Sequence, residues 1–137
     1  MYKKIMVPVD LAHADRLEKA LRTAADLSRH YAAPVCYVGI SAETPGPVAH
    51  NPEEYAARLK DFARAQAEAH GIEVATHPIA SHDPAIDLDR QLLDAADAVG
   101  ADLIVAGSHV PGLLDRIWPS HGGSLAAHAT ISVFVVR

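Results

Sequence analysis

A chain of 137 residues, of which 50% are hydrophobic and 21% charged, has the size and composition of one globular domain and not those of a disordered chain. Its formal net charge of −5 argues against nucleic acid or an acidic membrane surface as the main partner. The single cysteine, Cys36, excludes a disulfide framework within the chain, and its apolar neighbours predict a buried, inert thiol. We therefore expect residues 1–137 to form a single domain.

Targeting and membrane-spanning patterns are absent from the sequence. The first ten residues, MYKKIMVPVD, form a short apolar run broken by Pro8, which is unlike the apolar region of a signal peptide. No apolar stretch approaches the length of about 18 residues that crosses a bilayer. We therefore expect a cytoplasmic protein that is not embedded in a membrane.

Five short apolar runs predict β-strands, and helical patterns separate them. In chain order, the predicted strands cover residues 4–9, 35–40, 72–80, 101–106 and 132–136. The predicted helices cover about residues 15–30, 52–70 and 86–99, and a further helix begins after Ser120.

Capping residues mark the helix boundaries. Asn51, which is followed by a proline and two acidic residues, predicts the start of the second helix, and Gly71 predicts its end. Asp83, again followed by a proline, predicts the start of the third helix, which Gly100 closes. Residues 41–51 are rich in proline and glycine and therefore predict a loop or flap before the second helix.

The predicted fold is a doubly wound α/β sandwich. Strands that are apolar throughout belong to a parallel sheet covered on both faces, and right-handed crossovers between them give a doubly wound, Rossmann-like three-layer sandwich. For its five strands we expect the order 3-2-1-4-5. Pro78 indicates that the third strand lies at one edge. The apolar strand 132–136 lies at the other edge. An exposed apolar edge strand favours pairing with a second copy of the chain, so we expect a homodimer. The alternative is a monomer in which helices cover this edge.

Ligands of such sheets bind beyond the carboxyl ends of the strands, where the winding direction switches between strands 1 and 4. The residues expected to meet there are Pro8, Val9 and Asp10 after the first strand and Gly107, Ser108 and His109 after the fourth. The loop after strand 4 is therefore the predicted ligand loop.

The turn into the last helix predicts the second half of the site. Ser120 is an N-cap candidate, which makes His121 and Gly122 the first helical positions. The unpaired N–H groups and partial positive charge of a helix N-terminus bind phosphate, and glycines let an anion approach closely. Glycines at this position would equally allow tight helix packing, so the spacing alone does not distinguish phosphate binding from a packing role.

Several chemistries have no support in the sequence. It contains neither a G-x-x-x-x-G-K-[ST] nor a G-x-G-x-x-G pattern, which argues against a P-loop nucleotidase or a dinucleotide dehydrogenase. The nine histidines include no pair at the spacing of a metal site, so we expect scattered surface histidines and no metal. His109 and His121 differ because they face the predicted phosphate site. No catalytic residue is predicted.

Four segments in order along the chain, KKIMVPVDLA, HDPA, DLIVAGSH and SVFVVR, resemble the universal stress protein family. The resemblance covers essentially the whole chain. It implies the fold predicted above and binding of ATP or AMP, with or without Mg²⁺. It also implies a loop of the pattern G-x2-G-x9-G-[ST] after strand 4.

The resemblance carries over residue by residue only in part. Asp10 matches the adenosine-contacting Asp of the family, and Val38 matches a position whose backbone meets the adenine. Val110 stands where the second glycine of the loop usually lies, and Pro119 where the third does, in a loop one residue short. Such a shortened loop resembles one branch of the family that includes nucleotide binders. The predicted nucleotide-binding residues are Pro8, Val9, Asp10, Val38, Gly107, Ser108, His109, Val110, Ser120, His121 and Gly122.

The function implied by the resemblance is regulatory. Such a stress-response protein senses ATP or AMP, signals the nucleotide state to a partner such as a transporter or kinase, and dimerises through its last strand, with little or no turnover. Two alternatives stay open. In one, Val110 and Pro119 mark a degenerate site in a nucleotide-free interaction module. In the other, the protein is a slow ATP-hydrolysing enzyme.

Overall fold

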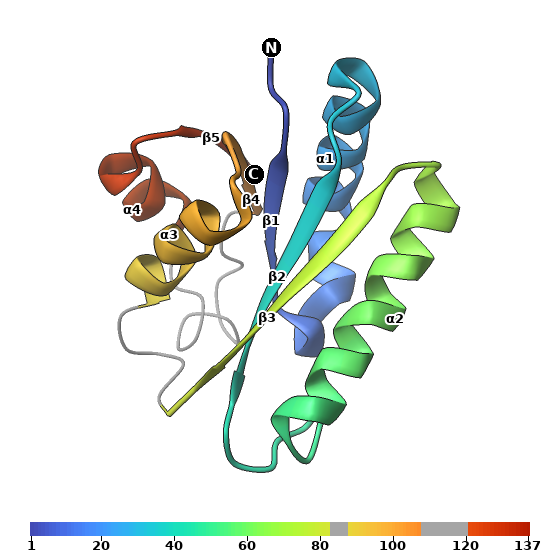
Figure 1. The fold of residues 1–137 in the computed structure, drawn as a ribbon, viewed down its shortest axis with the longest axis vertical. Helices are drawn as coiled ribbons and strands as arrows, with labels where there is room; N and C mark the ends of the chain where they lie inside the picture. The colour runs from blue at the N-terminus through green and yellow to red at the C-terminus, as the bar shows by residue number, and fades with distance from the viewer. Residues whose placement is uncertain (83–87, 108–120) are drawn as a thin grey trace.

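The computed structural model describes residues 1–82, 88–107 and 121–137, and the side chains of all of these except 121–124 (Figure 1). The elements in chain order are β1 (Ile5–Val9), the 3-10 helix η1 (Leu11–Leu17), α1 (Glu18–Tyr31), β2 (Val35–Ala42), α2 (Pro52–His70), β3 (Val74–Ser81), α3 (Leu88–Val99), β4 (Leu103–Gly107), α4 (His121–His128) and β5 (Ser132–Val136). The predicted helix cap at Asp83 lies outside the described residues, as do Ser108, His109, Val110, Pro119 and Ser120.

The strands form one parallel sheet in the order β3-β2-β1-β4-β5, which confirms the predicted topology. The central strand β1 is buried along its whole length, as an apolar strand covered on both faces must be. Pro78 lies in β3, an edge strand that has a neighbouring strand on one side only. Edge strands are where sheets tolerate proline, which has no backbone N–H to donate.

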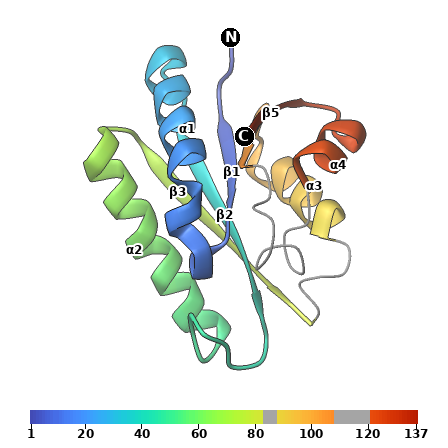
Figure 2. The same cartoon turned by 180° about the vertical axis from the view of Figure 1, so that it is seen from behind.

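Helices cover both faces of the sheet (Figures 1 and 2). On one face, Val7 and Val9 pack with Leu21 of α1 and Leu59 of α2. On the other face, Met6 of β1 and Cys36 and Val38 of β2 pack with Leu92 of α3 and Leu125 of α4. Each fully buried aliphatic side chain of this kind contributes about 1.5–3 kcal/mol. Burial also raises the pKa of the Cys36 thiol, in keeping with the predicted inert cysteine.

The helix boundaries of α2 confirm the sequence prediction. The Asn51 side chain accepts a hydrogen bond of 2.7 Å from the backbone N–H of Glu54, three residues along. Gly71 ends the helix with a φ of 64°, in the left-handed region that glycine adopts without strain. Gly100, with a φ of 71°, similarly follows α3.

Strands β3 and β4 each begin two residues later than predicted. Two further differences have clear physical reasons. The helical pattern assigned to residues 15–30 divides into η1 and α1, because the Asp10 side chain caps Ala12 and starts a tight 3-10 turn directly after β1. Strand β2 continues through Ser41 and Ala42, which the sequence assigned to a loop, because these residues pair with Ala80 and Ser81 of β3. The longer β2 carries the chain further past the carboxyl edge of the sheet.

Candidate functional site

The carboxyl edge of the sheet brings together the segments predicted to bind a ligand. Asp10 directly follows β1, and Gly107 is the last residue of β4, which pairs with β1. The chain leaves β1 toward the α1 and α2 face, whereas α3 and α4 flank β4 on the opposite face (Figures 1 and 2). The chain therefore leaves the neighbouring strands β1 and β4 toward opposite faces of the sheet. The point between such strands is the switch point at which doubly wound sheets bind ligands.

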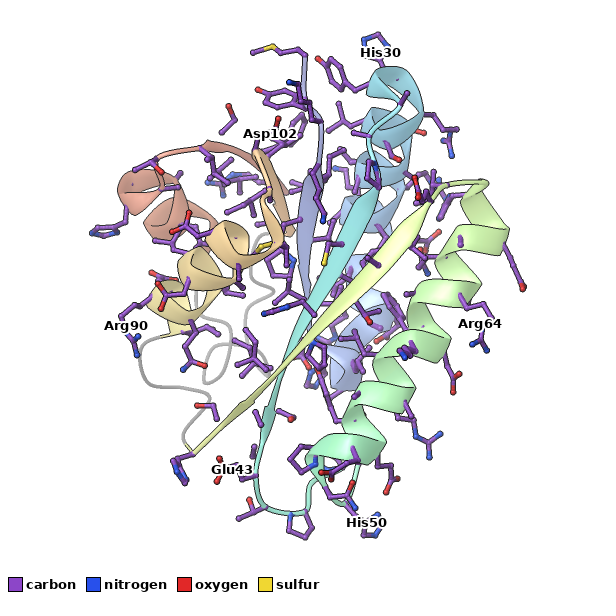
Figure 3. The ribbon with its side chains drawn as sticks, viewed as in Figure 1. His30, Glu43, His50, Arg64, Arg90 and Asp102 are labelled. Atoms are coloured by element: carbon purple, nitrogen blue, oxygen red, sulfur yellow. The ribbon has the colours of Figure 1, made fainter. Side chains whose placement is uncertain are left out.

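A pocket of about 660 Å³, including its open mouth, lies at this edge. Its lining comes from Asp10–Ala12 after β1, from Ile40–Ala42 at the end of β2, from six residues between Thr44 and Asn51, and from Tyr55 in α2. Figure 3 places Glu43 and His50 at this end of the molecule, opposite His30. A mostly apolar pocket of this size with a few polar groups has the properties of a small-molecule site.

Asp10 is the acidic group of the pocket, and it is held from two sides. Its Oδ1 accepts a hydrogen bond of 3.1 Å from the backbone N–H of Ala12, and its Oδ2 lies 3.0 Å from Nδ1 of His13. The Asp10 side chain is only 15% exposed. Each carboxylate oxygen has two acceptor sites, so the group can still accept hydrogen bonds from a ligand.

Tyr55 forms part of the pocket wall from the first turns of α2, with only 5% of its surface exposed. Its ring lies against Gly39 of β2, where a Cβ atom would collide with the Tyr55 hydroxyl. Burial raises the pKa of the Tyr55 phenol, and the negative charge of Asp10 raises it further. The phenol therefore stays protonated near neutral pH and can donate a hydrogen bond.

Four of the residues predicted from sequence lie at the edge but are not among the residues that line the pocket: Pro8, Val9, Val38 and Gly107. The first three are buried, and Val38 packs in the core facing α3. Only their backbone groups could therefore meet a ligand. Gly107 has a packing role, because a Cβ there would lie 3.2 Å from Cδ2 of Leu17.

His121 and Gly122 are the first two residues of α4, as predicted. Because β4 and β5 are parallel, the helix between them returns from the carboxyl edge, so its N-terminus faces that edge. Within the described part of the chain, no three histidine, cysteine or acidic side chains gather as a metal site would require.

Sequence reasoning missed Ile40, Tyr55 and His13. Ile40 lies two positions beyond Val38 and lines the pocket. Tyr55 lines it from helix α2, to which the sequence analysis assigned no part in binding. His13 was grouped with scattered surface histidines, although its spacing of three residues from a strand-terminal Asp is the pattern of a local pair.

The fold and the position of the pocket define a class: doubly wound parallel α/β proteins that bind ligands at the switch point of the sheet. The family model described as "Universal stress protein family" matches residues 1–137. The chain belongs to the universal stress protein family.

Known relatives agree with this assignment. Universal stress protein G of Shigella flexneri is 26% identical over 148 residues and covers 100% of both chains. The universal stress protein of Archaeoglobus fulgidus, solved in complex with dAMP, is 25% identical with a TM-score of 0.68 over 99% of this chain and 98% of that one. A universal stress protein in complex with cAMP shares the fold, with 20% identity and a TM-score of 0.72 over 99% and 97% of the two chains. Among the helices that the structure describes, none could cross a membrane.

Proposed function

We propose that this protein binds adenine nucleotides, AMP or ATP, in the pocket at the carboxyl edge, and that it acts as a regulator with little or no turnover. The observation that carries the proposal is a largely apolar pocket at the switch point with one fixed carboxylate, Asp10, in its wall. The complex of the Archaeoglobus fulgidus relative with dAMP supports the same ligand class.

The chemistry of the lining suggests where the base, the ribose and the phosphates of the nucleotide would lie along the carboxyl edge. The flat, apolar base suits the part of the pocket between Ile40 and the 44–51 loop. The Asp10 carboxylate is an acceptor for ribose hydroxyl groups. The phosphates would then extend toward the first N–H groups of α4, at His121 and Gly122, where the helix dipole favours negative charge.

Calorimetric titration of AMP, ATP and adenosine into the protein tests the proposal. We expect saturable binding of AMP, which Asp10→Ala weakens at least about tenfold because an ionic hydrogen-bond acceptor is lost. Asp61→Ala is the matched control, since Asp61 is an exposed aspartate of α2 whose partner is Arg64. Absence of adenine nucleotide binding by the unmodified protein would contradict the proposal and favour a nucleotide-free interaction module.

The placement of the phosphates and the lack of turnover have separate tests. Gly122→Val should weaken binding of AMP more than binding of adenosine, because it obstructs the approach to backbone amides; equal losses would indicate general damage to α4. Product formation from ATP that scales with the protein added would instead favour the enzymatic alternative.

We also propose that two copies pair through β5 and that the dimer signals nucleotide state to a partner protein, such as a transporter or kinase. Support for the pairing comes from Phe134, which is 45% exposed on this edge strand. An exposed apolar edge strand is a template for pairing with another chain. Light scattering at micromolar concentration should give a dimer that Phe134→Lys dissociates, whereas a monomer at all concentrations would contradict this arrangement.

A further inference from the structure

His13 lies beside the acidic group of the pocket without lining the pocket itself. Its ring is 25% exposed, and its Nδ1 lies 3.0 Å from Oδ2 of Asp10, on the side of the carboxylate away from the Ala12 N–H. The backbone of His13 leaves helical geometry, with φ −133° and ψ 34°, inside the 3-10 helix η1. The irregular turn thus places the imidazole against the carboxylate.

The chemistry of the pair fixes which atom donates. An ionised carboxylate only accepts hydrogen bonds, so Nδ1 of His13 carries the proton and donates it to Oδ2. Together with the Ala12 N–H, this bond engages both oxygens of Asp10. Rotation of the carboxylate would break one bond or the other.

We infer that His13 is a positioning residue of the nucleotide site: it holds the Asp10 carboxylate in the orientation that receives the ribose hydroxyl groups. The inference rests on the function proposed above, and it adds a group that acts through Asp10 and not on the ligand. A supporting hydrogen bond of this kind removes the need to order the carboxylate during binding.

Without the imidazole, Asp10 keeps only its bond to Ala12 and must be ordered by the ligand. We expect His13→Ala to weaken binding of AMP by about five- to tenfold, because binding must then include the cost of ordering one side chain. His13→Asn places an amide N–H near the position of Nδ1 and should lose less affinity than His13→Ala.

A double-mutant cycle separates positioning from a direct or general effect. Dissociation constants for AMP are measured by amide chemical-shift titration for the unmodified protein, His13→Ala, Asp10→Ala and the double variant. If His13 acts through Asp10, its substitution costs less than about twofold once Asp10 is alanine. An equal cost in both backgrounds, or no cost in the unmodified background, would overturn the inference. The control is His30→Ala, an exposed histidine at the far end of the molecule (Figure 3), which should leave affinity unchanged.

A second readout needs no nucleotide. The ¹⁵N shifts of the free protein should show His13 with a protonated Nδ1 at neutral pH, and Asp10→Ala should abolish that preference. An unprotonated Nδ1 would overturn the inference even if AMP binds normally. An intact Asp10–His13 pair in a protein that binds no AMP would overturn the proposed function and, with it, the role assigned to His13.

Discussion

The contact between Gly39 and Tyr55 predicts a large effect from adding one methyl group. In the structure, a Cβ on Gly39 would collide with the Tyr55 hydroxyl and lie 3.1 Å from both Cε1 and Cζ of the same ring. Because the ring is buried in the pocket wall, it cannot move without disturbing its neighbours. Gly39→Ala must therefore displace Tyr55.

The expected cost follows from two opposing terms. Overpacking of a filled site costs about 1–3 kcal/mol, whereas replacing a strand glycine by alanine otherwise gains about 0.5–1 kcal/mol. Because the Cβ would overlap the Tyr55 hydroxyl deeply, the overpacking cost falls in the upper half of its range. We therefore expect Gly39→Ala to lower the free energy of unfolding in urea by about 1–2 kcal/mol and to weaken binding of AMP. Tyr55→Phe removes the hydroxyl, so adding Gly39→Ala in that background should cost less.

Gly46 provides the matched control. Gly46 lines the pocket, as Tyr55 does, but a Cβ there would meet no atom within 4 Å, so Gly46→Ala should leave the free energy of unfolding nearly unchanged. If Gly39→Ala is as stable as the unmodified protein, Tyr55 does not lie against Gly39 and the described pocket wall is wrong.

Three further predictions concern stability. Asn51→Ala should lower the free energy of unfolding by about 1 kcal/mol in thermal melts, because the N-cap of α2 is lost; an unchanged melting temperature would contradict the cap. Asp102→Ala should lower it by about 1–3 kcal/mol in urea, because its carboxylate accepts from two backbone N–H groups just before β1 at 2.9–3.1 Å; no change would show that these bonds are dispensable. Burial raises the pKa of Tyr37 and of Tyr55 in the folded state only, so stability should fall as the pH rises above about 10, the ordinary tyrosine value. Urea unfolding at pH 9 and pH 11 checks this, and a double Tyr→Phe variant with an undiminished pH dependence would refute it.

The parts of the fold that the sequence predicted correctly depend on local signals. The central strands are uniformly apolar, and Asn51 and Gly71 mark the ends of α2 by capping chemistry that acts within a few residues. These signals were sufficient for the succession of strands and helices and for the position of Asp10 directly after β1. The order of the strands in the sheet was expected from the doubly wound fold class as a whole.

The parts that the sequence did not predict depend on contacts between distant residues. Ser41 and Ala42 have the composition of a loop, and only their pairing with β3 extends β2. The Gly39–Tyr55 contact joins a strand to a helix sixteen positions along, so neither residue indicates it alone. His13 forms a local pair, but nine histidines spread along the chain conceal it.

The most direct test of the central claim is an amide chemical-shift titration of the ¹⁵N-labelled protein with AMP. The proposal predicts saturating shifts at Asp10–Ala12, at Ile40–Ala42 and along the 44–51 loop, with little change in the groove between α1 and α2 that Phe62 and Gln66 line. Shifts confined to that groove, or no shifts at millimolar AMP, would contradict a nucleotide site at the carboxyl edge of the sheet.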